Sequence, residues 1–393
     1  YGETVQCDDG VQCGIAFLFA NLEWDKFVET HKNENPCFSD PDNIEFITNM
    51  MLKRMEQSPE QNVFSLGAFD SNIYCMCDRC LAIYREEGSR GGTYMRLANH
   101  VASVTKQKYP QNRIVYMAYG WATDVTKTVP DENVIVRFIN IASCFHHTID
   151  DPNCPHNRPL YKNIKEWAKI SKTFWMGEHG NTFRFCLAPV MNFDFLYKNI
   201  GFYNDMGCSG FIYWGNDGDA EFNPTRDYLI AHMFRYPDMT RDEYQILLES
   251  NFEARYGAAW RDMTEYIDIM DKAQQYVHFS SHRDAEGTIC ADLFDSKVDT
   301  LDALWKHMYD LTKEGTIQYK NLDTTFVNYL FIRQTVEWDK EYKNGTEEQK
   351  AEYVARNEQV YNLFHDNNIR WSEAYEYPGN VDFTRKPGYW SEH

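Results

Sequence analysis

Two acidic side chains stand at the ends of apolar segments, a position that often carries chemistry in α/β proteins. Asp70 directly follows an apolar segment over 62–69, and Glu178 ends the segment over 173–178, next to Gly177 and before Gly180. In parallel sheets, catalytic groups gather where strands end and loops begin. Cleavage of a glycosidic bond needs a proton donor together with a base or nucleophile. We therefore predict Asp70 and Glu178 as this pair, with helix capping as the alternative role for such acids.

Aromatic and polar side chains occupy the same strand ends, where aromatic faces can stack on sugar rings. The chain contains 26 Tyr, 25 Phe and 10 Trp, and we expect most of them in the core. An Arg inside an apolar strand must be paired or hydrogen-bonded. Arg137 therefore holds a catalytic carboxylate, binds an anionic sugar group such as a uronate, or forms a structural ion pair. The predicted substrate-binding residues are Tyr119, Trp121, Arg137, His147, Trp175, Tyr213, Trp214, Asn216 and Asp217, although for Asp217, Asp219 and Glu221 helix capping is the favoured role.

Cysteines form a second candidate site. Cys75, Cys77 and Cys80 make a C-x-C-x₂-C group just after a predicted strand. This spacing lets several thiolates converge on one tetrahedral zinc ion. Cys37, which precedes the helix before that strand, is the candidate fourth ligand if the chain folds back on itself. The alternative is that these cysteines, among 11 in the chain, are simply buried or disulfide-linked.

The elements that position these residues alternate between two patterns from residue 40 to about 216. Short β-branched or aromatic segments alternate with segments of helical periodicity, which is typical of a parallel sheet wound with helices. A complete (β/α)₈ barrel needs eight strands. The five or six strands expected before residue 220 are too few for a complete barrel, so either the early units are missing or the sheet is open. The expected strands are 62–69, 113–120, 134–142, 173–178 and 210–216, with 14–22 as a candidate sixth.

The pattern becomes helical after residue 237. Thr240 and Glu243 form a capping-box signature, and helices are expected over 292–312, 325–343 and 347–365. The sequence thus predicts an α/β fold: a (β/α) TIM-type barrel over 1–236, lacking its first strands if it is a barrel, followed by an α-helical C-terminal domain over 237–393.

Composition narrows the class of partner. The net charge of −20, from 39 basic and 59 acidic residues, excludes a basic nucleic-acid surface. The longest apolar segment, 15–20, is far shorter than the roughly 20 residues that span a bilayer. The chain starts at Tyr1 without an initiator Met or a signal-like segment, so we expect a processed or truncated start. We expect a carbohydrate partner, a structural zinc ion and no organic cofactor.

Six segments together carry a family resemblance: 35–43 (NPCFSDPDN), 69–80 (FDSNIYCMCDRC), 134–138 (VIVRF), 144–155 (CFHHTIDDPNCP), 215–222 (GNDGDAEF) and the helix ending at 254–257 (ARYG). They resemble the bacterial domain of unknown function 4838 family, whose members look like glycoside hydrolase barrels of the alpha-glucuronidase and hexosaminidase type. The resemblance implies that Cys37 completes the cysteine site and that Asp70 occupies the family's acidic position.

This sequence departs from that family pattern at two places. It has Met176, Gly177 and Glu178 where Trp-Asp is expected, and Tyr213 where a Glu is expected. If the missing Glu is the family's catalytic base, this chain uses Glu178 or Asp217 instead, or it has lost catalysis.

Three functional hypotheses follow. The leading one is a glycoside hydrolase that acts on a bacterial, plant or host glycan through paired carboxylates. The second is a non-catalytic glycan-binding protein on a decayed glycosidase barrel. The third is a metal-dependent hydrolase, although adjacent histidines usually point apart, one into the core and one beside a cleft. Glycan chemistry favours a periplasmic or secreted location over a cytoplasmic one, whereas a reduced four-cysteine site assembles more easily inside a cell. The histidines of the third hypothesis are His146, His147, His156 and His179.

Overall fold

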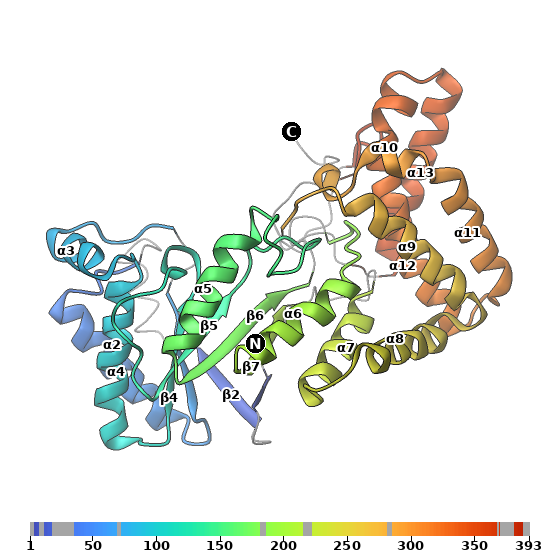
Figure 1. The fold of residues 1–393 in the computed structure, drawn as a ribbon. Helices are drawn as coiled ribbons and strands as arrows, with labels where there is room; N and C mark the ends of the chain where they lie inside the picture. The colour runs from blue at the N-terminus through green and yellow to red at the C-terminus, as the bar shows by residue number, and fades with distance from the viewer. Residues whose placement is uncertain are drawn as a thin grey trace. The chain divides into compact units, whose positions relative to one another are not determined.

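The computed structural model describes residues 4–7, 12–17, 35–68, 72–180, 186–214, 222–280, 285–367, 369 and 381–387 (Figure 1). The chain forms two compact units. The first comprises Tyr1–Asn140, Pro159–Glu178 and Phe202–Ile212, and the second comprises Ile141–Arg158, His179–Gly201 and Tyr213–His393. The domain boundary at residue 237 stays a prediction.

The first unit is built on a parallel sheet of five strands, β2 to β6. An additional strand, β1, pairs antiparallel with both β2 and β7, and the strand order β1 to β7 closes into a barrel. Each of the five expected strands, and the candidate sixth, overlaps a strand of the structure, whereas periodicity did not indicate β1. Residues 18–22, 69 and 215–216 of the expected segments lie outside the described residues. The strands are β1 (Thr4–Cys7), β2 (Gln12–Phe17), β3 (Val63–Leu66), β4 (Arg113–Ala118), β5 (Val134–Ile139), β6 (Thr173–His179) and β7 (Cys208–Trp214).

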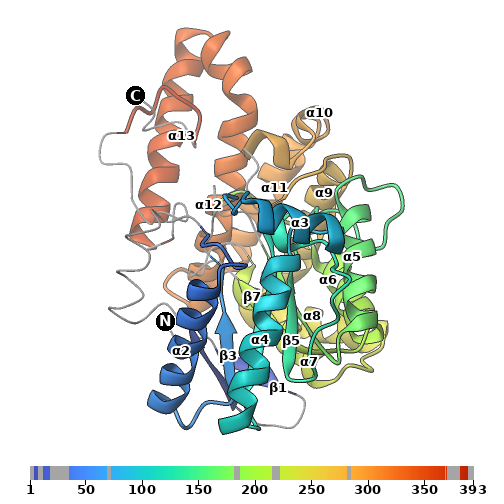
Figure 2. The same cartoon turned by 90° about the vertical axis from the view of Figure 1, so that its left-hand side faces the viewer.

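Helices α2 (Pro41–Gln57) and α4 (Gly92–Lys108) lie side by side against this sheet (Figures 1 and 2). Helix α2 begins as the sequence predicts, because the Asp40 side chain accepts a hydrogen bond from the Asp42 N–H at 3.0 Å and Pro41 occupies the first turn. Its buried face includes Ile47 and Met51. The same unit contains α3 (Asp78–Glu87), the short η1 (Gly120–Ala122) and most of α5 (Asn157–Ile170).

The core of the first unit is strongly aromatic. Every residue of β5 is buried, as expected for a parallel strand covered on both faces. Tyr116 on β4 packs against Tyr94 and Trp167, with ring centroids 4.5 and 5.4 Å away, and all three side chains are fully buried. Much of the aromatic content of this unit therefore fills the interior.

The second unit is mainly helical. The predicted capping box is present at the start of α8 (Arg241–Tyr256), where Thr240 and Glu243 exchange hydrogen bonds. Its core is also aromatic, with Trp305 packed against Tyr266 and Tyr329. The other helices of this part are α6 (Phe193–Asp205, whose end belongs to the first unit), α7 (Asn223–Arg235), η2 (Gly257–Ala259), α9 (Trp260–Gln274), η3 (Ala285–Thr288), α10 (Ala291–Asp295), α11 (Val298–Leu311), α12 (Ile317–Glu337), the π-helix η4 (Trp338–Lys343) and α13 (Glu347–Asp366).

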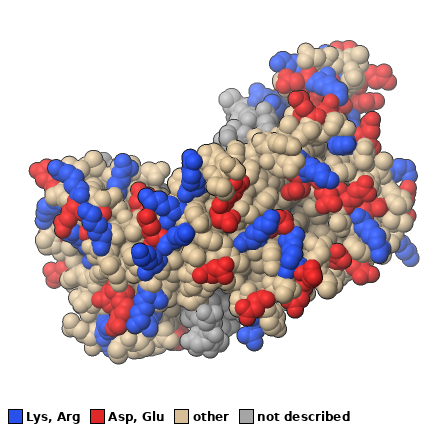
Figure 3. Space-filling view, in the orientation of Figure 1, with Lys and Arg blue, Asp and Glu red and all other residues tan. Residues whose placement is uncertain are grey.

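The surface carries mixed charge. On the face drawn in Figure 3, basic side chains are interspersed with acidic ones, and acidic side chains gather over parts of the helical region. Among the described residues, no helix is both long enough and apolar enough to cross a membrane.

Candidate functional site

Glu178 lies near the carboxyl end of β6 and forms a buried polar group with two neighbours. Asn140, the residue after β5, donates from Nδ2 to Glu178 Oε1 at 2.5 Å, and the Tyr203 hydroxyl on α6 donates to Oε2 at 2.6 Å. The Asn140 N–H also bonds to the Gly177 carbonyl at 3.1 Å, which continues the pairing of the two strands. Only 5% of Glu178 is exposed, and Asn140 and Tyr203 are fully buried.

Burial dominates the acid–base behaviour of this group. Desolvation disfavours a buried carboxylate and raises the pKa of Glu178 to about 7, although the hydrogen bonds from Tyr203 and Asn140 act in the opposite direction. A carboxyl group with this pKa is partly protonated at neutral pH. It is therefore suited to donating a proton, which an ordinary Glu cannot do efficiently under these conditions.

Three of the predicted strand-end residues, Asp70, Asn216 and Asp217, lie outside the described residues. Their roles therefore stay predictions from the sequence. The capping roles favoured for Asp219 and Glu221 also fall outside the described part of the chain.

Trp121 lies in η1, just after β4, as part of an aromatic cluster. Its ring centroid is 5.8 Å from that of Tyr74, 6.0 Å from Tyr94 and 6.2 Å from Phe38. Trp121 and the nearby Tyr119 are each half-buried, so part of both side chains remains at the surface. Phe38 and Tyr94 also line a small, largely apolar hollow at the end of β3.

Two other predicted binding residues are buried inside the sheet. Arg137 is fully buried on β5. Burial raises the pKa of Tyr94, and the positive charge of Arg137 acts in the opposite direction. Trp175 on β6 is 3% exposed, and its indole ring fills the space that a side chain at Gly210 would need. The binding roles of Arg137 and Trp175 stay predictions from the sequence.

His179, Tyr213 and Trp214 meet in the second unit. The His179 and Trp214 rings are stacked, with centroids 4.8 Å apart and planes 12° apart, so one face of the half-buried Trp214 is covered by imidazole. The Gly180 N–H donates to the Trp214 carbonyl at 3.2 Å. A Cβ at Gly180 would overlap the Tyr213 ring, so this close approach requires glycine.

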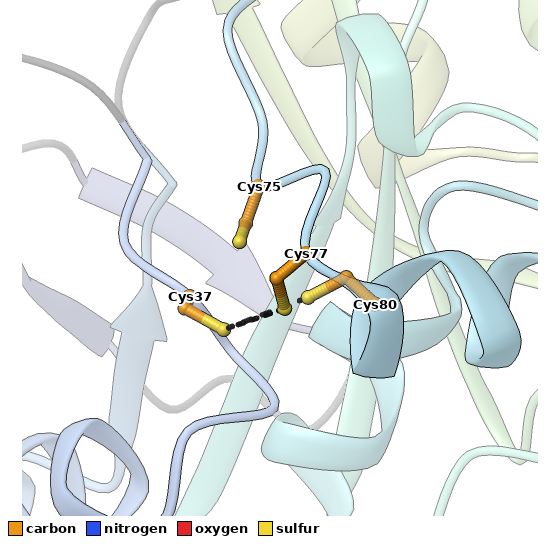
Figure 4. A group of neighbouring side chains, drawn as sticks. All are labelled: Cys37, Cys75, Cys77 and Cys80. Carbon is orange, nitrogen blue, oxygen red and sulfur yellow. Dashed lines mark hydrogen bonds between the residues drawn. The ribbon is translucent and has the colours of Figure 1, made fainter.

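The four predicted cysteines come together (Figure 4). Cys37 lies in the loop before α2, Cys75 and Cys77 lie in the loop before α3, and Cys80 lies in the first turn of α3. The Cys37 sulfur is 3.7 Å from that of Cys77 and 3.6 Å from that of Cys80, and all four sulfurs lie within 4.8 Å of one another. All four are free thiols, so they are not linked by disulfides. This arrangement can hold a metal ion.

Contacts other than those between the four sulfurs hold the two loops of this site together. The Asn35 amide donates to the Ile73 carbonyl at 2.9 Å, and Arg79 forms an exposed ion pair with Asp40 at 2.6 Å. The Ser39 hydroxyl lies 3.1 Å from the Cys80 sulfur. These contacts explain how the chain folds back so that Cys37 reaches the C-x-C-x₂-C segment.

The local backbone also favours a thiolate at Cys77, which precedes the first residue of α3. The backbone N–H of Cys80 is the largest influence on the Cys77 thiol and lowers its pKa to about 6. The positive end of the helix dipole acts in the same direction. Thiolate is the form of cysteine that binds metal ions.

The adjacent histidines have different surroundings, as expected. His146 is 1% exposed and packs against Phe279, and burial lowers its pKa to about 3. His147 is half-buried and belongs to a second group of potential metal ligands with Cys144, Cys154 and His278. Sequence reasoning missed this group. Its signal was the C-x₂-H-x₆-C spacing from Cys144 to Cys154, whose fourth member lies far away in the chain.

Comparison with known proteins places the chain in a family. Residues 23–268 match the model described as "Domain of unknown function (DUF4838)". The chain belongs to this family. The match confirms the resemblance carried by the cysteine and histidine motifs, since it includes both segments. No curated protein matches the sequence significantly.

This DUF4838 member also has matches among solved structures. One is a GH138 enzyme targeting pectin rhamnogalacturonan II, with 11% sequence identity and a TM-score of 0.48. The alignment covers 88% of this chain and 62% of that enzyme, so the chain spans less than two thirds of its length.

Proposed function

We propose that this DUF4838 protein is a glycoside hydrolase in which Glu178 donates a proton to the leaving-group oxygen. The observation that carries the proposal is the position of a buried carboxyl group, with a pKa raised to about 7, near the carboxyl end of a sheet strand. Raising the pKa of one carboxyl group by burial is how glycosidases keep a proton donor at neutral pH. Asn140 and Tyr203 orient this group through both of its oxygens.

The proposal assigns the other half of the acid–base pair to Asp70, on the basis of the sequence. The scaffold in this proposal is a variant TIM-type barrel, whose five parallel strands direct their carboxyl ends to one edge. Trp214 is the proposed sugar platform, because it is half-buried and one of its faces is fixed by His179. A protein with this activity would meet polymeric glycans in the periplasm or outside the cell.

The cysteine group is proposed to hold a structural Zn²⁺ ion. Zinc–thiolate bonds of about 2.3 Å in a tetrahedron place the sulfurs roughly 3.8 Å apart. The sulfur distances of 3.7 and 3.6 Å from Cys37 agree with this arrangement. Four protein ligands leave no open position for substrate, so the ion would fix the loops before α2 and α3 rather than take part in chemistry.

Activity would be tested on a panel of bacterial, plant and host glycans, with the product anomers followed by NMR. We expect turnover by the intact protein and its loss in Glu178→Gln and Asp70→Asn. The matched control is Glu166→Gln, which alters an exposed carboxylate on α5 and should leave turnover unchanged. Full turnover in Glu178→Gln would overturn the assignment of the proton donor.

A non-catalytic glycan-binding protein is the second candidate. The observation that favours it is the phenol of Tyr213, which packs against Gly180 at the position where the family resemblance leads one to expect a Glu. This candidate predicts saturable glycan binding by calorimetry without any product. Binding should then survive Glu178→Gln and weaken in Trp214→Ala.

A further inference from the structure

The second group of potential metal ligands consists of Cys144, His147, Cys154 and His278, and all four belong to the second unit. Glu178 and the four-cysteine group belong to the first unit. Nδ1 of His147 is 3.2 Å from Sγ of Cys144. Nδ1 of His278 is 3.8 Å from Sγ of Cys144 and 3.6 Å from Sγ of Cys154. The four potential ligand atoms all lie within 4.8 Å of one another. Three side chains from one short segment and a fourth from a distant part of the chain therefore converge on one point.

These distances match a metal-centred tetrahedron. With zinc–sulfur bonds of about 2.3 Å and zinc–nitrogen bonds of about 2.0 Å, neighbouring sulfur and nitrogen ligands lie roughly 3.5 Å apart. The three sulfur–nitrogen distances are close to this value: 3.2 Å is slightly shorter, and 3.6 and 3.8 Å are slightly longer. We propose that Cys144, His147, Cys154 and His278 bind a second Zn²⁺ ion, independent of the four-cysteine site.

The donor set determines the class of ion. Two thiolates and two imidazoles in a tetrahedron favour Zn²⁺, whereas Mg²⁺ and Ca²⁺ prefer oxygen ligands. Cys144 and Cys154 are 3% and 0% exposed, and His147 and His278 are half-buried. Four protein ligands close the coordination sphere, so the ion is structural. A nucleophilic Cys144–His147 pair is the competing role, which alkylation of the native protein tests below.

The fold holds the first three ligands in place without help from the ion. Asn157, fully buried at the start of α5, accepts a hydrogen bond at Oδ1 from the Cys144 N–H at 2.7 Å. Its Nδ2 donates to the carbonyls of His147 and Thr148 at 2.8 and 3.0 Å. The segment that carries the ligands is thus wrapped around one amide side chain. Such second-layer hydrogen bonds typically orient metal ligands.

The fourth ligand is delivered by a separate contact. His278 follows α9, and the next residue, Phe279, accepts a hydrogen bond at its carbonyl from the Phe145 N–H at 2.9 Å. The rings of Phe145 and Phe279 also pack edge to face in a small core with Val190. This pairing sets His278 beside Cys144. A zinc ion here would join the segment after β5 to the segment after α9, with Cys154 and His278 separated by 124 positions in the sequence.

Zinc content of the full-length protein, purified without chelators, is the first test. We expect two zinc ions per chain, falling to one in Cys154→Ser and to one in the double variant Cys37→Ser, Cys77→Ser. His156→Gln and Cys290→Ser are the matched controls, because the His156 ring lies 5.5 Å from that of His278 without belonging to the group and Cys290 lies outside both groups. Both controls should retain two ions. A count that does not fall in Cys154→Ser would overturn the proposal.

X-ray absorption at the zinc edge distinguishes the two sites even if a variant fails to fold. The intact protein should show an average of three sulfur and one nitrogen ligands per zinc, and the Cys37→Ser, Cys77→Ser variant should show two of each. One zinc with four sulfurs would refute this site and leave the four-cysteine site standing. One zinc with two sulfurs and two nitrogens would do the reverse. Rapid alkylation of Cys144 in the native protein, dependent on His147, would identify a reactive pair and overturn the proposal.

Discussion

The clearest quantitative consequence of the structure concerns the stability cost of an ionised Glu178. The carboxyl group has an ordinary pKa of 4.5 in the unfolded chain and about 7 in the folded one. Between these values the folded state holds the proton more tightly than the unfolded state. The contribution of this group is therefore fully present below pH 4.5 and is lost as pH rises through 7.

The size of this loss follows from the shift in pKa. One pKa unit corresponds to about 1.4 kcal/mol, so a shift of roughly 2.5 units gives about 3 kcal/mol over the whole window. Glu178→Gln replaces the titrating group by a neutral one of the same shape. We therefore expect the variant to gain about 2–3 kcal/mol of unfolding free energy relative to the natural protein between pH 5 and pH 8.

Urea unfolding at pH 5, 6, 7 and 8, followed by circular dichroism and tryptophan fluorescence, would measure this difference. Glu166→Gln is the control, because it makes the same substitution at an exposed carboxylate on α5. A constant difference between Glu178→Gln and the natural protein across this range would refute the raised pKa. If Glu178→Gln is more stable than the natural protein and has no turnover, then the ionisable Glu178 lowers stability and is required for catalysis.

Three further changes test other parts of the structure. Tyr203→Phe removes a hydrogen bond that lowers the pKa of Glu178, so the alkaline limb of the pH–activity profile should move to higher pH; a limb that stays in place would contradict the proton-donor role. Gly210→Ala places a Cβ about 2.5 Å from the Trp175 ring, and the resulting strain should cost about 1–3 kcal/mol of unfolding free energy in urea titrations. Thr240→Ala should cost about 1 kcal/mol by the same measurement, with Thr240→Ser close to the natural protein if the capping box is responsible.

Local features of the fold were predictable because they depend on residues close together in the chain. The start of α2 at Asp40 and Pro41, and the capping box before α8, are interactions within one turn of helix. The strand segments were recognisable for a similar reason, since parallel strands covered on both faces are nearly continuous apolar segments. Strand β1, only four residues long and antiparallel to its neighbours, has no such signature.

The candidate sites divide in the same way. The sequence itself identified Glu178 as a strand-end acid and Cys75, Cys77 and Cys80 as a ligand group, because their spacing is local. It could not supply the pKa of Glu178, since that value depends on the desolvation of the carboxyl group by the surrounding fold.

Contacts between distant segments were decided by tertiary structure alone. Cys37 was expected through family resemblance, and its position beside Cys77 depends on the return of the chain across α2 and β3. His278 was not expected beside Cys144, because 134 residues separate them and no local pattern records the pairing of Phe145 with Phe279. Periodicity and spacing thus determine which residues have the right chemistry and secondary structure. Only packing determines which of them meet and how strongly burial alters their protonation.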